Sequence, residues 1–175
     1  MSRLKLLILD ACVVIQLHEL GRWQQVVERC DIHLSEIVAR REVKFDDANG
    51  MRIDLEPAIH SKAITLFGVD AAKVDAFRTR FDSSYLGVLD DGEAESLAYM
   101  FDTKSEFLIS SADKIVYRVL GNMNRGHQGI SLEEILNRIG LTISQLPPQY
   151  RREFRERWTQ VGLEERLNGI GFNSN

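Results

Sequence analysis

The sequence predicts an α/β fold, with a parallel sheet of about four strands flanked by helices, and two observations carry this prediction. Short apolar runs indicate buried strands at 5–9, 32–34 and 106–110. The segments between these runs space apolar residues at helical intervals, as in Trp23, Val26, Val27 and Cys30. Strands that alternate with helices are typical of a sheet whose strands run parallel.

Caps and turn residues predict the elements between the second and last strands. The segment EIVARREV is expected to be helical, with Ser35 as its N-cap. The next stretch contains Asn49-Gly50, a dipeptide typical of a β-hairpin turn. Two helices are predicted after it. One begins near Pro57, which suits a first helical turn, and the other has Asp70 as a possible N-cap.

Most of the chain after residue 90 is predicted to be helical. The segment GEAESLAYM places apolar residues on one helix face, and ADKIVYRVLG is expected to be a helix closed by Gly121. Ser131 and Glu134 fit a capping box at the start of LEEILNRIG. A last amphipathic helix follows Pro147-Pro148, with its apolar side marked by Tyr150, Phe154, Trp158 and Val161.

Composition and charge narrow the class of protein. The chain has 175 residues, 44% hydrophobic and 27% charged, which is ordinary for one globular domain. No apolar run approaches the roughly 18 residues of a membrane span, and Asp10 interrupts the N-terminal apolar stretch, so neither a membrane segment nor a signal peptide is expected. Cys12 and Cys30 lack zinc-ligand spacing and are expected to be reduced thiols. We therefore expect a cytoplasmic protein.

The net charge of −4 gives no overall basic field that would attract nucleic acid. Any contact with nucleic acid must therefore come from a local patch or a metal ion. The segment RREFRER, at 151–157, can contact RNA phosphate or an acidic partner, although its two glutamates favour a solvated helix face.

Acidic residues follow two of the predicted strands. Asp10 ends the first strand and has apolar neighbours on both sides, and Asp113 lies just past the last strand. Ligands of parallel sheets bind beyond the carboxyl ends of the strands, so both acids are candidate site residues. Each also has a purely structural interpretation. Asp10 and Asp113 can cap the helices that follow them, Glu42 can be a solvated helix residue, and Glu93 can complete a capping box with Asp90.

If Asp10, Glu42, Glu93 and Asp113 converge, a divalent cation is the natural partner. Clustered carboxylates repel one another by about 3 kcal/mol per pair at ~5 Å and an effective dielectric near 20. They tolerate this only with raised pKa values or a bound cation. Oxygen ligands favour Mg²⁺ or Mn²⁺, and such an ion suits phosphodiester hydrolysis.

Four segments resemble motifs of the PIN-domain family in their order and spacing. LILDACVVI resembles the first motif, a hydrophobic strand ending in Asp, and SEIVARREV resembles the second, a helix carrying Glu. GEAESLAYM is similar to the Gly-Glu-Ala-Glu helix of a branch related to VapC-type toxins. FLISSADKIVYRVLG is similar to the closing motif, and the resemblance covers about residues 4–122.

The resemblance implies a Rossmann-like PIN core at 1–122, with 123–175 as a helical extension packed on the same domain. It implies an Mg²⁺- or Mn²⁺-dependent endoribonuclease, with RNA as substrate and an antitoxin protein as a possible partner. Exposed apolar surface on the last helix would also suit a homodimer. Carried over by position, the metal and catalytic residues are Asp10, Glu42, Glu93 and Asp113. Ser111 matches a hydroxyl position that orients a ligand or water.

Some positions depart from the family pattern. The family commonly has Ser, Thr or Asn where this chain has Cys12, which weakens a polar helper beside Asp10. The second motif can shift by one residue in alignment, which leaves Glu36 as the alternate to Glu42. In the third motif, Glu95 and Asp91 are alternates to Glu93. We prefer Glu42, because Val38, Glu42 and Phe45 are expected on neighbouring helical turns.

Two other functions are weighed against the ribonuclease. A phosphatase of the haloacid-dehalogenase type needs a second Asp two residues after the first, where this chain has Cys12. A non-catalytic PIN-like module that binds RNA or a protein partner is the stronger rival, and Cys12 and the shifted second motif favour it.

Overall fold

Four parallel strands form the centre of the computed structural model, which describes residues 4–43 and 52–173. Along the sheet their order is β3 (Ile64–Phe67), β2 (Cys30–Ser35), β1 (Leu4–Leu9) and β4 (Leu108–Ser110). All three pairings are parallel. The predicted α/β class and the parallel sheet are therefore confirmed, including the three strands located from the sequence.

The strand order creates a natural ligand site beside β1. The chain builds the sheet from β1 through β2 to β3, and then returns to add β4 on the other side of β1. Open α/β sheets bind their ligands at such a switch point, beyond the carboxyl ends of the strands. Asp10 lies at this point. Its backbone N–H donates a 3.0 Å hydrogen bond to the carbonyl of Ser110, the last residue of β4.

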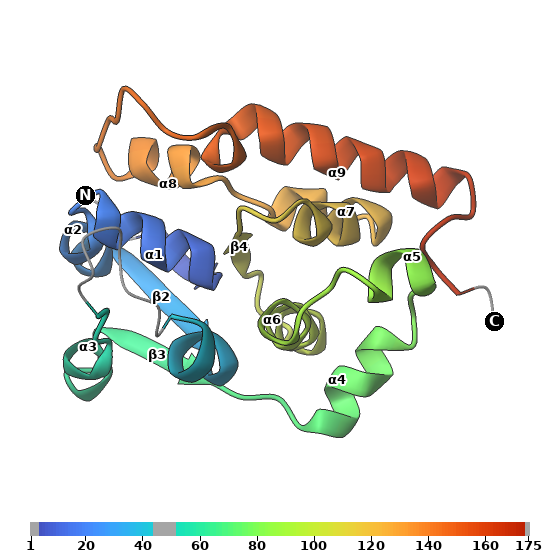
Figure 1. The fold of residues 1–175 in the computed structure, drawn as a ribbon, viewed down its shortest axis with the longest axis horizontal. Coiled ribbons are helices and arrows are strands. Elements are labelled where there is room, and N and C mark those ends of the chain that lie inside the picture. The colour runs from blue at the N-terminus through green and yellow to red at the C-terminus, as the bar shows by residue number, and fades with distance from the viewer. Residues whose placement is uncertain (1–3, 44–51, 174–175) are drawn as a thin grey trace.

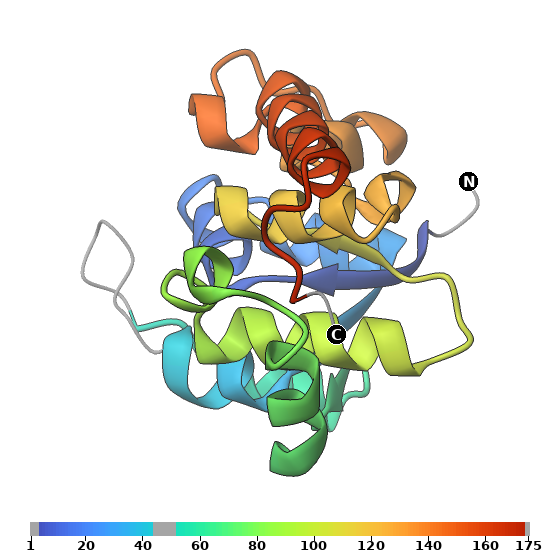
Figure 2. The ribbon, with the colours of Figure 1, turned by 90° about the vertical axis from the view of Figure 1, so that its right-hand side faces the viewer.

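Helices cover both sides of the sheet (Figures 1 and 2). Figure 2 shows the sheet between α7 and α9 above and α6 and α4 below. The helices along the described chain are α1 (Ala11–Glu19), α2 (Trp23–Arg29), η1 (Val38–Glu42), α3 (Glu56–His60), α4 (Ala71–Arg78), α5 (Ser83–Leu86), α6 (Asp91–Asp102), α7 (Lys114–Asn122), η2 (Gly126–Gln128), α8 (Leu132–Arg138), η3 (Pro148–Tyr150) and α9 (Arg152–Leu167).

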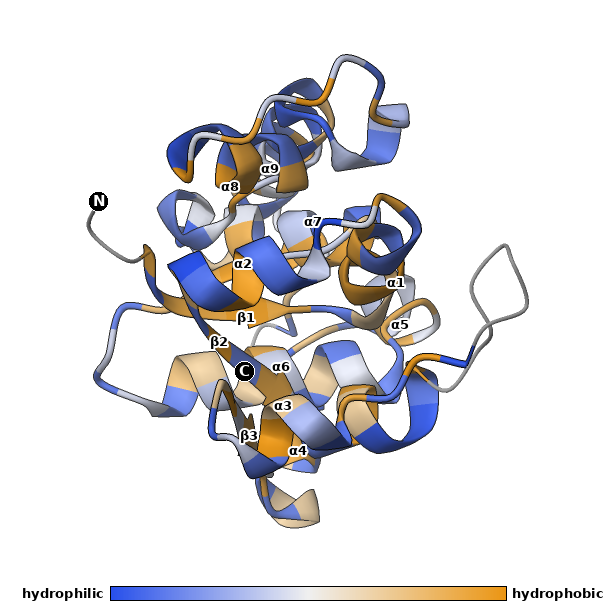
Figure 3. Cartoon of the chain, turned by 90° about the vertical axis from the view of Figure 1, so that its left-hand side faces the viewer, coloured by the Kyte–Doolittle hydropathy of each residue, from blue (hydrophilic) through white to orange (hydrophobic). Residues whose placement is uncertain are grey.

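The core is divided by β1. Successive side chains of a strand point to opposite faces. Leu7 and Leu9 accordingly pack in a cluster with α1, α2 and α8, whereas Ile8 packs in a second cluster with α6 and α7. All three residues are fully buried, and Figure 3 shows β1 as a hydrophobic strand enclosed by helices. This burial on both faces explains why the strand reads as a continuous apolar run.

Several predicted helix starts are confirmed. The Ser35 hydroxyl accepts a 3.0 Å hydrogen bond from the N–H of Val38, at the start of the second-motif helix. That helix continues as a π-helix, closed by a 3.0 Å hydrogen bond from Val43 N–H to the Val38 carbonyl. Both predicted capping boxes are present, at the starts of α6 and α8.

Other predictions are wrong or fall outside the described residues. β3 was not located from the sequence. Asp70 occupies the predicted N-cap position of α4, but its side chain makes no capping hydrogen bond to the helix. The Asn49-Gly50 hairpin and Phe45 lie outside the described residues. No helix in 4–43 or 52–173 is long and apolar enough to cross a membrane.

Gly121 does not close α7, because the helix continues through it to Asn122. It lies instead where α7 meets α9. A Cβ at Gly121 would be 2.0 Å from the carbonyl oxygen of Thr159, and a Cβ at Gly162 would be 2.0 Å from that of Arg118. The two helices therefore approach backbone to backbone, which attaches the C-terminal extension to the rest of the fold.

This crossing predicts that Gly162→Ala destabilises the protein. The added methyl group must displace the backbone of α7 rather than a flexible side chain, so we expect a loss of about 1–3 kcal/mol in unfolding free energy. Urea unfolding measures it. Gly68→Ala is the control, because a Cβ there meets only the Glu36 side chain at 3.8 Å. Equal stability of the two variants would contradict the close approach.

Candidate functional site

A cavity of about 350 Å³ opens at the carboxyl ends of β1 and β4. Its lining comes from the β1–α1 junction, the end of η1, the start of α6 and the β4–α7 loop. The lining residues are Asp10, Ala11, Cys12, Glu42, Asp90, Glu93, Ala112 and Asp113. All four acids selected from the sequence thus line one cavity, at the switch point of the sheet.

Asp10 is the most buried acid that follows a strand, with 7% of its surface exposed. Its Oδ1 accepts a 2.8 Å hydrogen bond from the N–H of Ala11, so it caps α1. Its Oδ2 accepts hydrogen bonds from the Ser111 hydroxyl at 2.7 Å and the Cys12 thiol at 3.2 Å. Burial raises the pKa of Asp10 against these three hydrogen bonds, which favour its charged form.

Ser111 and Cys12 join the two loops that form the cavity floor. The Ser111 hydroxyl accepts a 2.9 Å hydrogen bond from the N–H of Asp113, and the Cys12 sulfur accepts one of 3.1 Å from the N–H of Ala112. Each side chain therefore holds the β4–α7 loop and also donates to Asp10. Cys12 thus makes a polar contact with Asp10 although the family commonly has Ser, Thr or Asn at this position, and the expectation of a weakened polar helper is corrected.

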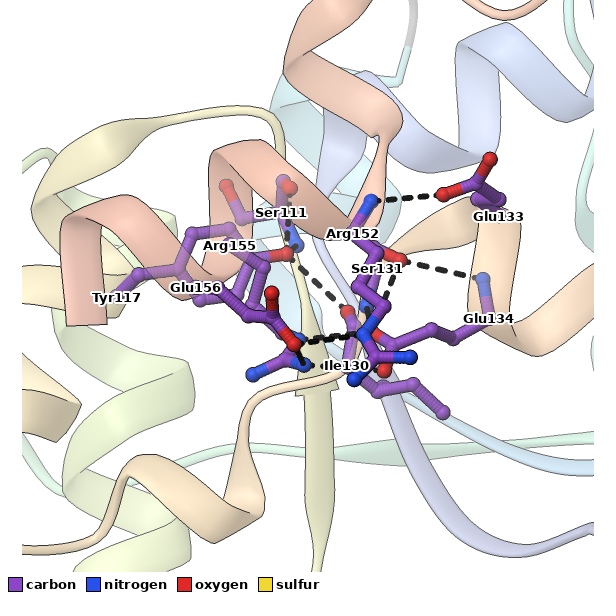
Figure 4. A network of polar contacts seen from close by, with 9 residues as sticks. All are labelled: Ser111, Tyr117, Ile130, Ser131, Glu133, Glu134, Arg152, Arg155 and Glu156. Carbon is purple, nitrogen blue, oxygen red and sulfur yellow. Dashed lines mark hydrogen bonds and ion pairs between the residues drawn. The ribbon is translucent and has the colours of Figure 1, made fainter. Parts of the chain in front are cut away.

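Tyr117, in α7, also holds the β4–α7 loop. Its hydroxyl accepts a 3.2 Å hydrogen bond from Ser111 N–H and lies 2.8 Å from the Ser111 carbonyl and 3.1 Å from that of Ile130 (Figure 4). Tyr117 is fully buried in α7. Tyr117 thus holds the backbone of Ser111, while the Ser111 hydroxyl donates its hydrogen bond to Asp10.

Glu42 reaches the cavity from the other side, at the end of η1. Its Oε1 accepts a 3.2 Å hydrogen bond from the N–H of Gly92 in α6. A Cβ at position 92 would lie 2.3 Å from the Glu42 carboxylate, so only glycine permits this approach. Partial burial and the charges of Asp90 and Asp10 raise the pKa of Glu42 to about 7.

Glu93 and Asp90 enter the cavity together at the start of α6. Asp90 accepts a 2.8 Å hydrogen bond from Glu93 N–H, and Glu93 accepts one of 3.1 Å from Asp90 N–H. Burial, then the charges of Asp10 and Asp90, raise the pKa of Glu93 to about 9. Partial desolvation of the Asp90 carboxylate, then the charges of Asp10 and Asp113, raise its pKa. Sequence reasoning assigned Asp90 only a capping role and missed its place in the cavity.

Asp113 lines the cavity from its rim. The residue is exposed, and its carboxylate caps α7 by accepting a 3.0 Å hydrogen bond from Ile115 N–H. Asp10, Glu93 and Asp113 all fulfil the capping roles that were weighed for them, and they line the cavity as well. The structural and functional interpretations of these acids are therefore compatible.

The alternate acids lie elsewhere. Glu36 is exposed and is not part of the cavity lining, and Asp91 forms a 2.8 Å ion pair with Arg78. Glu95 is buried and accepts hydrogen bonds from Ile37 N–H at 3.3 Å and Val69 N–H at 3.1 Å. Glu95 thus holds the start of the helix that carries Glu42. The structure places Glu42 and Glu93 in the cavity, and not their alternates.

The carboxylates share a cavity without forming a closed metal cage. Among the residues that the structure describes, no group of three or more His, Cys, Asp or Glu side chains is arranged to hold a metal ion. Mg²⁺ does not need such a cage, because it keeps several water ligands and binds proteins through one or two carboxylates. The donor chemistry and the volume of the cavity fit a hydrated Mg²⁺ or Mn²⁺ ion.

A second cavity, of about 550 Å³, contains none of these acids. It lies between η1 and α3, where Arg40 and Arg52 stand near Asp54 and Glu56. The charges of its described lining residues balance, so it offers no preference for an anion or a cation.

Comparisons of the chain with protein-family models, curated proteins and solved structures found no match.

The raised pKa of Glu93 predicts that the metal-free protein loses stability as the pH rises. The pKa of Glu93 is about 9 in the folded protein against an ordinary value of 4.5. Between these values the folded chain retains a proton that the unfolded chain has released, so the unfolding free energy decreases with pH. The full contribution of Glu93 is present below pH 4.5 and is lost as the pH passes its folded value.

Urea unfolding across this pH range, in EDTA, measures the slope. Glu93→Gln should flatten it, because glutamine cannot lose the proton. The exposed Glu106→Gln is the control and should keep the slope of the original protein. If Glu93→Gln and the original protein lose stability in parallel, the assignment of the slope to Glu93 is wrong.

Proposed function

We propose that the chain is a divalent-metal-dependent endoribonuclease with a PIN-like active site formed by Asp10, Glu42, Glu93 and Asp113. One observation carries the proposal. These acids were selected from four separate sequence motifs, and all of them line one cavity at the switch point of a parallel sheet. Capping accounts for Asp10, Glu93 and Asp113, but it does not account for Glu42, which enters the same cavity from the end of η1.

The electrostatics of the cavity support a cationic partner. Asp90 joins the other acids, and the pKa values of Glu42 and Glu93 are raised to about 7 and 9 in the absence of any cation. A divalent ion would offset this repulsion and return the carboxylates to their charged forms. When bound, Mg²⁺ or Mn²⁺ supplies an activated water and stabilises charge on the phosphate and leaving oxygen.

The protein's own residues would orient this chemistry. Ser111 and Cys12 hold the Asp10 carboxylate through two hydrogen bonds, and Asp10 in turn is held by Ala11. Asp113 stands at the exposed rim, where an incoming phosphodiester first meets the site. Hydrolysis adds water across the P–O bond, so no redox partner is needed.

The VapC-like resemblance extends the proposal to a toxin that is paired with an antitoxin protein. A cytoplasmic location and a homodimer belong to the same proposal but do not rest on the resemblance. The second candidate is a non-catalytic PIN-like module that binds RNA or a protein partner. It is favoured by the lack of a three-residue metal group among the described residues, and by the capping roles that already account for Asp10, Glu93 and Asp113. The two candidates differ in whether RNA is cleaved.

Asp10→Asn should abolish most ribonuclease activity while the protein stays folded. Asparagine keeps the shape of the side chain but removes its charge, so we expect a rate lower by roughly 10²–10⁴-fold. The assay uses a pool of single-stranded and hairpin RNA with Mg²⁺, Mn²⁺ or EDTA, and circular dichroism checks the fold. Asp91→Asn, which alters an exposed acid outside the cavity, is the matched control. EDTA-resistant cleavage that is equal in all proteins would exclude the metal mechanism, and no cleavage by the original protein would favour the binding module.

Glu42→Gln and Glu36→Gln should behave differently, although both change a glutamate of the second motif. Glu42 lies in the cavity, whereas Glu36 is exposed outside it. We expect Glu42→Gln to lower the rate by about tenfold or more, and Glu36→Gln to change it by less than about twofold. Single-turnover cleavage with Mn²⁺ measures both. The reverse order would make Glu36 the site residue.

A further inference from the structure

A tryptophan on α9 contacts two positively charged side chains, one of which directly follows a residue of the carboxylate cavity. The indole ring of Trp158 is 5.4 Å from the Lys114 ammonium and 5.3 Å from the Arg157 guanidinium, measured to the ring centroid. We call these three residues the tryptophan patch. Trp158 is partly exposed, and both cations are exposed.

The two cations of the patch are free to bind an anion. Most other arginines at the start of α9 are occupied. Arg152 pairs with Glu156 at 2.6 Å, and Arg155 forms two hydrogen bonds, of 2.7 and 3.0 Å, with Glu134 (Figure 4). Lys114 and Arg157, in contrast, form no ion pair with any residue in the described part of the chain.

The indole is held in place by other aromatic rings. Trp158 makes an edge contact with Phe154, with ring centroids 6.2 Å apart, and Phe154 makes one with the buried Tyr117 at 6.3 Å. Tyr117 also holds the loop of Ser111. The same aromatic side chain therefore supports the tryptophan patch and the cavity floor.

One residue of the patch is next in the sequence to a residue of the cavity. Lys114 directly follows Asp113, so their Cα atoms are about 3.8 Å apart. Asp113 lines the rim of the cavity. The start of α7 therefore contributes Asp113 to the cavity and Lys114 to the tryptophan patch.

We propose that the tryptophan patch binds single-stranded RNA, with a base stacked on Trp158 and the neighbouring phosphates bound by Lys114 and Arg157. This inference rests on the proposed ribonuclease function and names the form of its substrate. An acidic cavity in a protein with a net charge of −4 repels phosphate, so the substrate needs a local cationic contact. Aromatic rings flanked by cations bind unpaired bases of any sequence, whereas a duplex hides its base faces.

The fluorescence of Trp158 gives a direct test. The chain has two tryptophans, and Trp23→Phe leaves Trp158 as the only tryptophan, whose emission is read with excitation selective for indole. In EDTA, which prevents metal-dependent cleavage, a single-stranded oligouridine should quench this emission at low salt, and a hairpin duplex of equal length should quench it much less. Absence of quenching by the single strand would overturn the proposal and would leave an acidic protein partner as the ligand of the patch.

Charge-removing variants test the cations. Lys114→Gln with Arg157→Gln should weaken binding of the oligouridine on the order of tenfold, and should lower the slope of log affinity against log salt by about 1.4. Lys104→Gln with Arg138→Gln removes the same charge from exposed residues at the ends of α6 and α8 and is the matched control. An equal loss of affinity in both double variants would show a general effect of net charge and would overturn the proposal that the patch binds RNA.

Cleavage assays separate failure of the patch from failure of the proposed function. With Mg²⁺, the patch double variant should raise KM and leave kcat within about twofold. An active protein whose KM does not change in that variant would reject the patch and keep the ribonuclease. A protein that cleaves nothing but binds oligouridine through Trp158 would reject the ribonuclease and keep the patch.

Discussion

The hydrogen bond between the Ser111 hydroxyl and Asp10 is the contact on which the site depends. At 2.7 Å it joins the ends of β1 and β4, the two strands on either side of the switch point. Ser111 and Cys12 each donate to Asp10 and also accept from a backbone N–H of the β4–α7 loop. Two loops that are about 100 residues apart in the chain are thereby held as one surface. Without these two donors, a carboxylate with 7% exposure would keep only the hydrogen bond from Ala11 N–H to replace the water it has lost.

Two opposing effects act on the charge of Asp10. Burial beside the core disfavours the charge of Asp10, and the three hydrogen bonds favour it. Glu93 accepts one backbone hydrogen bond, and its burial, followed by the charges of Asp10 and Asp90, raises its pKa to about 9. Glu42 is less buried, and its pKa is raised to about 7. Carboxylates in one cavity thus differ in how readily they ionise, and the more deeply buried glutamate keeps its proton to a higher pH.

Much of the fold followed from local sequence signals. The strands at β1, β2 and β4 are apolar runs, and both capping boxes depend on side chains three residues apart. β3 was missed because it has only four residues, of which Ile64 and Phe67 alone are buried, so its apolar signal is short. Gly121 was misassigned because a glycine that ends a helix and a glycine that permits a helix crossing look alike until the second helix is known. The site acids could be selected at strand ends, but the place of Asp90 depends on the angle of α6, and the thiol contact of Cys12 depends on a loop 100 residues away.

The contact between Glu42 and Gly92 links two motifs that are 50 residues apart in the chain. A side chain at position 92 would occupy the space of the Glu42 carboxylate, 2.3 Å from the ideal Cβ. Aspartate at position 42 is one methylene shorter and would withdraw from that space. A methyl group at position 92 would have to displace the far end of the flexible Glu42 side chain, and the carboxylate would move away from the N–H that now binds it. How far Glu42 reaches into the cavity is therefore limited by the size of a residue in another motif.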